Sequence, residues 1–596
     1  MKKHIFAESF KFNIMRNFYL AWLLLAFCCL FSCSKEDTTP FLKGENENTT
    51  KSPDSVTMTE GEIVLGEKLD NPFSVSNMQK AYNSLLKDKN KLSQLSTLGE
   101  IKTTHYYVRF LPKSEEELDI LQSHTDWILY EYPLDYEILE YGISYHDPSL
   151  PDSSLTYQYA AIEADKFDPY RGHMAIEYEI LENLYIPEEA AVSGEKPGTG
   201  FKPSTSTVIE MLVNESLRLT GNLDDTVSPT SGQWYPSGRI MAYDDIVEDT
   251  IPLEGVQVRM RYWFTTRWAT TDKDGYFKCG KSFSHAVNYS IVWQGDRWDI
   301  RDGCIGQAYY NGPKLKTEWN LTIGNGTTRS LRYSAIHRAA YRYYNGDTYG
   351  LSRPANSRKE KIGYFHKDGG INGSYFRQIG AGIGIDIAIY GISNGEYREP
   401  SNIYSTACHE LGHASHYTNS KSKYKTAQNR VIESWARFTQ YHLTNKEYEE
   451  LGFLHSLNEH TIFDLSGLFT PPVYIETYMI TPDHQYNFQK WNTHIGDTFM
   501  DYTPLFIDMS DDMNQRYYYE LMESTKGTIS HPEYYPDDDV AFLPAEAIEN
   551  FVFNSTSFAE IKWALEKYVL DNPELRDDDM YNFTAENINK LFECYL

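Results

Sequence analysis

The sequence is poor in cysteine and in positive charge, and each shortage excludes a class of protein. It has seven cysteines, and the four that follow Cys33 lie far apart without a Cys-x-x-Cys pair: Cys279, Cys304, Cys408 and Cys594. This spacing excludes a zinc ribbon and a disulfide-built scaffold, although one or two disulfides could still form outside a cell. Lysine and arginine total 55 against 84 acidic residues, for a net charge of −29. Because such a chain repels phosphate backbones, nucleic acid is excluded as a partner.

The chain also lacks an apolar run that could span a membrane and any repeat with a period of roughly 20 to 50 residues. Its N-terminal apolar run, residues 18–32, follows four basic residues and has the length of a secretory signal peptide. Met15 heads a compact version of the same signal, so Met1 and Met15 are both candidate starts. The sequence therefore predicts that residues 1–32 direct export and are then removed.

The end of this signal also contains a segment that resembles a lipid-attachment site. Residues 30–33, Leu-Phe-Ser-Cys, resemble a bacterial lipobox with Cys33 as the lipid acceptor, and Lys35 followed by two acids resembles the export signal of Bacteroides-type surface lipoproteins. These resemblances imply a protein anchored in the outer membrane through lipid on Cys33 and facing the cell exterior. The polar residues 33–61 are expected to form a flexible stalk. A plain secretory signal with an incidental cysteine is the alternative.

The remaining length exceeds what one hydrophobic core usually organises, so the sequence predicts a multidomain α+β protein. Residues 62–192 mix helix-like and strand-like periodicity, which is typical of a small α+β domain. Helices are expected there at 75–86 and 114–122, and strands at 105–111 and 127–130. A stretch rich in Gly, Pro and Ser at 193–206 is expected to be a linker. The domain could be an inhibitory or chaperone-like propeptide, a regulatory domain or a spacer.

Residues 207–297 are predicted to form a β-sandwich. Val256 and Val258 alternate in a strand, and an Asp-Lys-Asp-Gly run at 272–275 leads into an aromatic strand. That run lacks the distal glutamate of an EF-hand loop, so it indicates a turn rather than a calcium site. Residues 251–260 and 270–277 resemble the transthyretin-like domain appended to carboxypeptidases, and this resemblance implies an accessory module.

Residues 298–596 form the last region, which is expected to be mainly helical and is large enough for a complete catalytic domain. Helices are predicted at 334–344, 402–417 and 429–442, and Ser401 can cap the second of them. A segment at 382–390 alternates isoleucine with mostly small or polar residues and predicts a strand. The residues suited to metal chemistry gather on the last two of these helices.

A His-Glu-Leu-Gly-His pattern spans residues 409–413. On a helix His409 and His413 lie one turn apart on the same face, so both imidazoles can bind one metal ion. Glu410 is offset by about 100° and can act on a water beside that metal without being a ligand. Because this pattern arises by chance roughly once in thirty such chains, a third ligand is needed to support it.

Two residues could supply that third ligand, and spacing separates them. His416 lies seven residues after His409 on the same helix, and the corresponding rise of about 10.5 Å is too long for one tetrahedral ion. Glu433 lies twenty residues after His413, on the next predicted helix. Glu433 is therefore the better candidate.

The histidine pattern, the twenty-residue interval and Glu433 in Glu-Ser-Trp-Ala resemble the gluzincins, the zinc peptidases that include thermolysin and the zinc aminopeptidases. The resemblance implies a zincin-like domain in which His409, His413 and Glu433 hold Zn²⁺. It further implies that Glu410 is the general base of peptide hydrolysis. The sequence departs from some members at Arg437, where they carry an acid that orients a zinc-binding histidine.

The resemblance also implies a downstream donor that stabilises the transition state. His494 lies at about the expected separation from Glu433, and three residues are alternatives: Tyr478, His484 and Tyr502. In the gluzincins a strand just before the active helix binds the peptide as an added strand, so residues 382–390 are either that edge strand or an ordinary half-buried one.

The expected substrates are peptide bonds of extracellular proteins or glycoproteins. The chain has no Gly-Ala-Met-Glu-Asn type of segment, which favours an endopeptidase over an aminopeptidase. The alternative is a non-catalytic surface lipoprotein that binds glycans or adheres, since 47 tyrosines and 11 tryptophans are compatible with sugar-stacking surfaces.

Overall fold

The computed structural model describes residues 61–88, 95, 100–124, 126–151, 154–168, 176–187, 203–223, 233–370, 373–377, 384–393, 395–452, 503–511, 514, 516, 537–577, 580–593 and 595. The predicted signal peptide at 1–32, Cys33 and the stalk up to residue 60 lie outside these residues, as do His494 and its three alternatives. Within the described ranges, no helix has both the length and the apolar character needed to cross a membrane.

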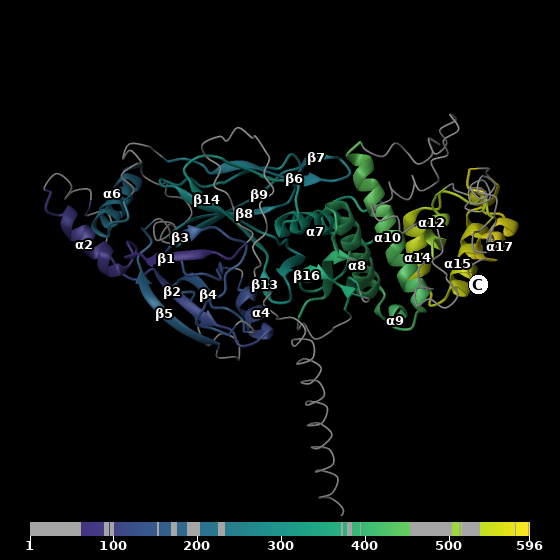
Figure 1. The fold of residues 1–596 in the computed structure, drawn as a ribbon, viewed down its shortest axis with the longest axis horizontal. Helices are drawn as coiled ribbons and strands as arrows, with labels where there is room; N and C mark the ends of the chain where they lie inside the picture. Colours follow the sequence, from purple (N-terminus) through teal and green to yellow (C-terminus); the bar gives the residue numbers. More distant parts are fainter. Residues whose placement is uncertain are drawn as a thin grey trace, which may run out of the picture.

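The chain has a mixed α and β fold with several sheets and helices, in agreement with the predicted multidomain α+β class. The elements follow one another along an elongated molecule (Figure 1). The N-terminal elements lie at the left of the view, the middle sheets above the centre, and the last helices at the right.

The first region is built on a three-stranded antiparallel sheet in the order β4-β2-β5. Its elements are β2 (His105–Leu111), α4 (Glu115–Ser123), β4 (Gln158–Glu163) and β5 (Glu177–Leu184), with a second small sheet of β1 (Val64–Lys68) and β3 (Tyr136–Glu140). β2 and α4 confirm the predicted strand and helix. The strand predicted at 127–130 is wrong, because only Tyr130 forms a bridge, to Tyr159. Trp127 instead stacks its ring on Phe110 at 5.4 Å, so this apolar segment packs without pairing.

Two helices cover the outer end of this region. α2 (Val75–Leu85), which confirms the helix predicted at 75–86, packs against α6 (Pro203–Leu219), and they share a core that includes Met78 and Leu212. α6 takes up the end of the expected linker, and the boundary predicted at residue 207 falls inside it. The apolar side chains of α6 belong to the N-terminal core. The polar stretch before α6 predicts a domain boundary there, and so the sequence does not reveal this packing.

The middle region contains two four-stranded sheets, ordered β10-β6-β15 with β7 beside β6, and β14-β11-β8-β9. The strands are β6 (Ser237–Asp244), β7 (Asp249–Pro252), β8 (Gln257–Tyr262), β9 (Thr265–Thr270), β10 (Tyr276–Lys278), β11 (Val287–Val292), β14 (Tyr309–Leu315) and β15 (Trp319–Ile323). The turn predicted at 272–275 is confirmed: Asp272 accepts the backbone N–H groups of Asp274 and Tyr276, both at 3.0 Å, and Gly275 has φ +79°.

The boundary expected at residue 297 does not divide the sheets. β12 (Trp298–Asp302) and β13 (Gly306–Gln307) join the sheet of the last region, but β14 and β15 return to the middle sheets. The buried apolar residues of both regions form one continuous core. Strand partners are chosen by packing across the core, and the order of strands along the chain does not reveal them.

The last region has a six-stranded sheet in the order β13-β12-β16-β18-β17, with β19 beside β18. Its remaining strands are β16 (Glu360–Asp368), β17 (Tyr375–Phe376), β18 (Ile387–Ser393) and β19 (Glu396–Tyr397). β18 lies between β16 on one side and β17 and β19 on the other, so of the two alternatives for residues 382–390 the edge strand is wrong. The strand begins at Ile387, later than predicted. Its Ile387 and Ile389 are fully buried, as suits an interior strand. In the described part of this sheet, the short strands β17 and β19 form the edge beside β18.

Helices complete the last region: α7 (Arg329–Tyr344), α8 (Pro400–Asn419), α9 (Lys421–Tyr424), α10 (Asn429–Glu450), α12 (Leu505–Asp508), α14 (Ala545–Asn554), α15 (Phe558–Asp571), α16 (Glu574–Asp577) and α17 (Ala585–Glu593). α7, α8 and α10 confirm the three predicted helices. α7 begins five residues before the predicted residue 334, because the Thr328 hydroxyl caps it by accepting the Leu331 N–H at 3.3 Å.

A buried ion network joins the middle region to these helices. Arg338 of α7 binds Asp244 of β6 at 2.6 Å and Glu447 of α10 at 3.0 Å. All three residues are buried. Removing one partner would leave a buried charge unpaired, which is strongly destabilising. The network therefore holds α7 and α10 in fixed positions on the middle sheet.

Candidate metal centre

The helix that carries the histidine pattern starts on a support from the middle region. α8 begins at Pro400, where a proline fits because the first helical N–H needs no partner. Ser401 does not cap the helix as predicted. Its N–H and hydroxyl both donate to the Asp245 carboxylate, at 2.8 and 2.5 Å. A carboxylate at this end of α8 also complements the helix dipole.

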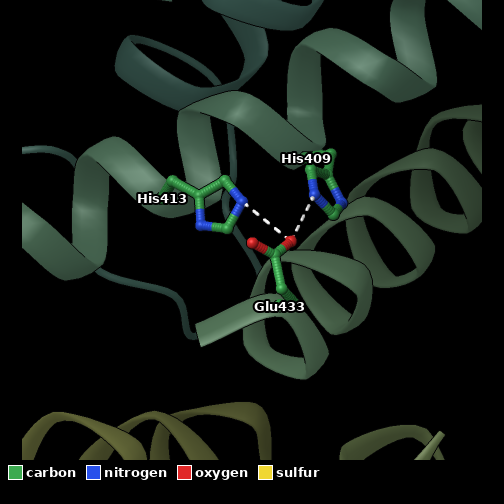
Figure 2. Close-up of side chains that lie close together, drawn as sticks. All are labelled: His409, His413 and Glu433. Carbon is green, nitrogen blue, oxygen red and sulfur yellow. Dashed lines mark ion pairs between the residues drawn. The ribbon is translucent and has the colours of Figure 1, made fainter. Parts of the chain in front are cut away.

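The three predicted ligands meet at one point. His409 and His413 project from one face of α8 toward Glu433 of α10 (Figure 2). Their Nε2 atoms lie 3.5 and 3.4 Å from the same oxygen, Glu433 Oε2. One ligand atom from each of the three side chains lies within 4.8 Å of the others. The twenty-residue spacing thus brings the carboxylate between the imidazoles.

A glycine allows the two helices to approach this closely. A Cβ atom at Gly412 would lie 2.9 Å from Cβ and 3.0 Å from Oγ1 of Thr439 on α10. Contacts that short would push the helices apart. Gly412 therefore sets the separation at which Glu433 reaches both histidines.

The trio fits a tetrahedral cation of the size of Zn²⁺. Ligand atoms about 2.1 Å from such an ion lie about 3.4 Å from one another. The two imidazole nitrogens lie 3.5 and 3.4 Å from Glu433 Oε2, and all three ligand atoms lie within 4.8 Å of one another. Glu433 Oε2 is buried and has no hydrogen-bond partner in the described part of the chain. Burial by itself raises the pKa of Glu433, but His413 and His409 outweigh it and hold that pKa well below its usual range. The carboxylate is therefore charged and suited to a cation.

Glu410 lies beside the trio as a buried carboxylate, one oxygen of which has no hydrogen-bond partner among the described residues. It is 4% exposed, and the oxygen without a partner is Oε2. Burial raises the pKa of Glu410 to about 7, opposed by His409 and Arg398 and by the backbone N–H of Phe376 that binds the carboxylate. A cation at the trio would lower this pKa again, since positive charge favours the ionised form. Such a group can accept a proton near neutral pH.

Tyr424 of α9 contacts the outer side of one ligand. Its hydroxyl lies 3.5 Å from Nδ1 of His413, and its ring packs edge-on against the imidazole at 6.4 Å. A group bonded to the far nitrogen of a metal-binding histidine fixes the orientation of the ring. Tyr424 is thus placed to fix the orientation of the His413 ring.

Tyr424→Phe is expected to weaken Zn²⁺ binding about tenfold, because the variant loses the Tyr424 hydroxyl that would orient the His413 ring. Competition with a fluorescent chelator would measure the dissociation constant. Tyr417→Phe is the matched control, because the Tyr417 ring packs on Tyr424 at 5.5 Å but does not contact a ligand nitrogen. Equal affinity in the wild type and both variants would show that Tyr424 does not position His413.

Two neighbouring residues have structural roles. His416 is buried with its ring stacked on Phe553 of α14 at 5.0 Å, and it is not part of the ligand group. Arg437, the departure from the family pattern, is buried one turn after Glu433, and its charge lowers the pKa of Asp508 of α12 against the larger effect of burial. Its position one turn from the ligand therefore serves the contact between α10 and α12.

The sequence alone did not point to Phe376, Arg398 or Tyr424. Phe376 and Arg398 act on Glu410 from a strand and a loop that precede α8. Tyr424 lies in the polar segment between the helices predicted at 402–417 and 429–442. An aromatic side chain inside that polar segment was the one signal available, since a solvated turn has little need of one.

No protein-family model matches this chain, and no curated protein matches it. The arrangement of the residues at the site is therefore what supports a functional proposal.

Proposed function

We propose that this chain is a zinc-dependent metallopeptidase of the gluzincin type. The observation that carries the proposal is the approach of His409 Nε2 and His413 Nε2 to one buried oxygen of Glu433 at 3.5 and 3.4 Å, beside the open carboxylate oxygen of Glu410. Two imidazoles and one carboxylate form the ligand set of a catalytic zinc with an open position.

A zinc ion held there would polarise the scissile carbonyl and lower the pKa of a coordinated water. Glu410 would accept a proton from the attacking water and pass it to the leaving amine. The Phe376 N–H holds this carboxylate in place, which leaves Oε2 to take the proton. β17 offers its main chain beside Glu410, so an extended peptide could pair with it as an added strand. His494 remains the proposed donor to the transition state.

The finer organisation of the chain belongs to the same proposal. We assign a small α+β domain to residues 62–192 together with α6, a transthyretin-like sandwich to the middle region and a zincin-like fold to the last. Lipid on Cys33 would anchor the protein in the outer membrane, facing outward, and its substrates would be extracellular proteins or glycoproteins. The support for the anchor is the lipobox-like segment at 30–33 and the acidic export signal after it.

Removal of the metal is expected to abolish proteolysis by the detergent-solubilised full chain, and one equivalent of Zn²⁺ is expected to restore it. Without a metal ion, the site has no cation to polarise the water from which Glu410 would take a proton. Cleavage of a fluorogenic peptide library, before and after treatment with 1,10-phenanthroline, would measure this. Full activity of zinc-free protein would contradict the proposal. Less than roughly half an equivalent of zinc after metal-replete purification would favour a non-catalytic glycan-binding or adhesive lipoprotein.

A further inference from the structure

A cavity lies between the N-terminal and middle regions, apart from the metal centre. Its volume is about 480 Å³, and its walls come from β3, α6, the tip of the β8–β9 hairpin and the end of β14. These elements lie at the left and upper left of the view, whereas α8 and α10 lie to the right of centre (Figure 1). The cavity shares no residue with the metal centre, so what it binds is independent of the proposed peptidase function.

Arg261 is a buried cation in the wall of this cavity. It is 4% exposed, and it donates to the backbone oxygens of Trp263 at 2.9 Å and Leu134 at 3.4 Å. Its side chain also hydrogen-bonds Tyr132, and its Cζ lies 5.5 and 5.7 Å from the ring centres of Tyr130 and Tyr132. Its Nε has no hydrogen-bond partner, and within the described ranges no carboxylate forms an ion pair with it. Burying a charge without a counter-ion is costly. By contrast the buried Arg301 and Arg338 each bind an aspartate, at 2.5 and 2.6 Å.

Further positive charge surrounds the same space. Lys314 and Lys316 also line the cavity, on and just after β14. The pKa of His285 in the same wall is lowered to about 4, by burial and then by Lys316 and Lys314. Glu137 and Glu210 also line the cavity, so its wall carries three cations and two carboxylates, a small excess of positive charge in a chain with a net charge of −29. Such a cavity attracts an anion.

The rest of the wall is aromatic and amide-bearing. Tyr262 stacks on His285 with the ring centres 4.6 Å apart and the planes 4° from parallel, and the next residue, Trp263, has φ +52° at the hairpin tip. A non-glycine residue in that region of φ is uncommon and is held by its surroundings. Asn214 and Asn288 line the cavity beside these rings. Apolar faces with a few placed polar groups are typical of a small-molecule site.

We propose that this cavity binds an acidic sugar unit of a glycan, with the sugar carboxylate paired to Arg261 and the lysines and the sugar ring lying on the aromatic wall. A free phosphate or sulfate would use the cations but leave the aromatic and amide groups without a role. Glu137 and Glu210 also line the cavity and can accept the hydroxyl groups of a sugar. A volume of about 480 Å³ suits one or two sugar rings.

Titration calorimetry on the solubilised full chain tests this with four probes. Glucuronic acid and N-acetylneuraminic acid are expected to bind at least tenfold more tightly than glucose and than sodium sulfate, and to weaken as ionic strength rises. Equal binding of glucuronic acid and glucose would overturn the role of charge. Sulfate as tight as the sugar acids would overturn the role of the ring, and no binding of either acid would overturn the site.

Variants then assign the binding to this cavity. Arg261→Gln is expected to weaken binding of the sugar acids at least tenfold. Because Arg261 is buried and the variant could fail to fold, the exposed Lys314 provides a second variant, Lys314→Glu, with the same expected loss. Lys273→Glu makes the same charge change on an exposed turn of the middle region outside the cavity and should bind as the wild type does. Unchanged affinity in a folded Arg261→Gln or in Lys314→Glu would overturn the proposal.

Discussion

Replacement of Glu410 by glutamine is expected to lower kcat for peptide hydrolysis by about 100- to 10,000-fold while Zn²⁺ stays bound. The amide keeps the size of the side chain and the hydrogen-bond acceptor for the Phe376 N–H, but it cannot take a proton. The three proposed ligands are unchanged, so zinc content should remain near one equivalent. Steady-state cleavage of a fluorogenic peptide and metal analysis of the same sample would measure both quantities.

Stability provides the control for this variant. The Glu410 carboxylate is buried with an unpartnered oxygen, and burial raises its pKa to about 7. Removing that charge should leave the melting temperature the same or higher. Glu549→Gln makes the same change at a buried carboxyl on α14 that binds Ser352, and it should keep full activity. Hydrolysis at the wild-type rate by Glu410→Gln would exclude Glu410 as the general base.

Replacement of Glu433 by glutamine is expected to weaken Zn²⁺ binding by more than about 100-fold, and activity should fall with it. The carboxylate supplies the third ligand and the only negative charge among the three proposed ligands, and an amide oxygen supplies neither charge nor comparable affinity. Losing a directly bound ligand should cost more than the roughly 10- to 100-fold that loss of an orienting group costs. Chelator competition and zinc content after dialysis would measure the effect.

A second glutamate on the same helix separates loss of the ligand from a general effect on α10. Glu449 binds Lys446 at 2.7 Å and is exposed, so Glu449→Gln should bind zinc as the wild type does. If Glu433→Gln retained wild-type zinc affinity, Glu433 would not be the third ligand, although His409 and His413 could still bind the metal. That result would redirect the search to a ligand outside the described residues.

The sequence determined those features that depend on neighbours along the chain. A five-residue pattern on a helix must place His409 and His413 on one face, since the side chains of residues i and i+4 always meet there. The helices at 334–344, 402–417 and 429–442 and the turn at 272–275 follow from local periodicity and turn chemistry in the same way. The twenty-residue interval singled out Glu433 through a family resemblance.

Packing between distant segments decided the rest. The contact of Glu433 with both imidazoles depends on how closely α8 approaches α10, and Gly412 against Thr439 sets that approach. The interior position of β18 depends on pairing with β16 and β17. The position of Arg261 in a cavity wall depends on which residues the N-terminal region brings to the β8–β9 hairpin. Local patterns limit the conformation of each element, but partners far apart in the chain are chosen by the total energy of the packed core. The sequence alone therefore singled out the three candidate metal ligands, and only the tertiary structure brought Glu433 to both histidines.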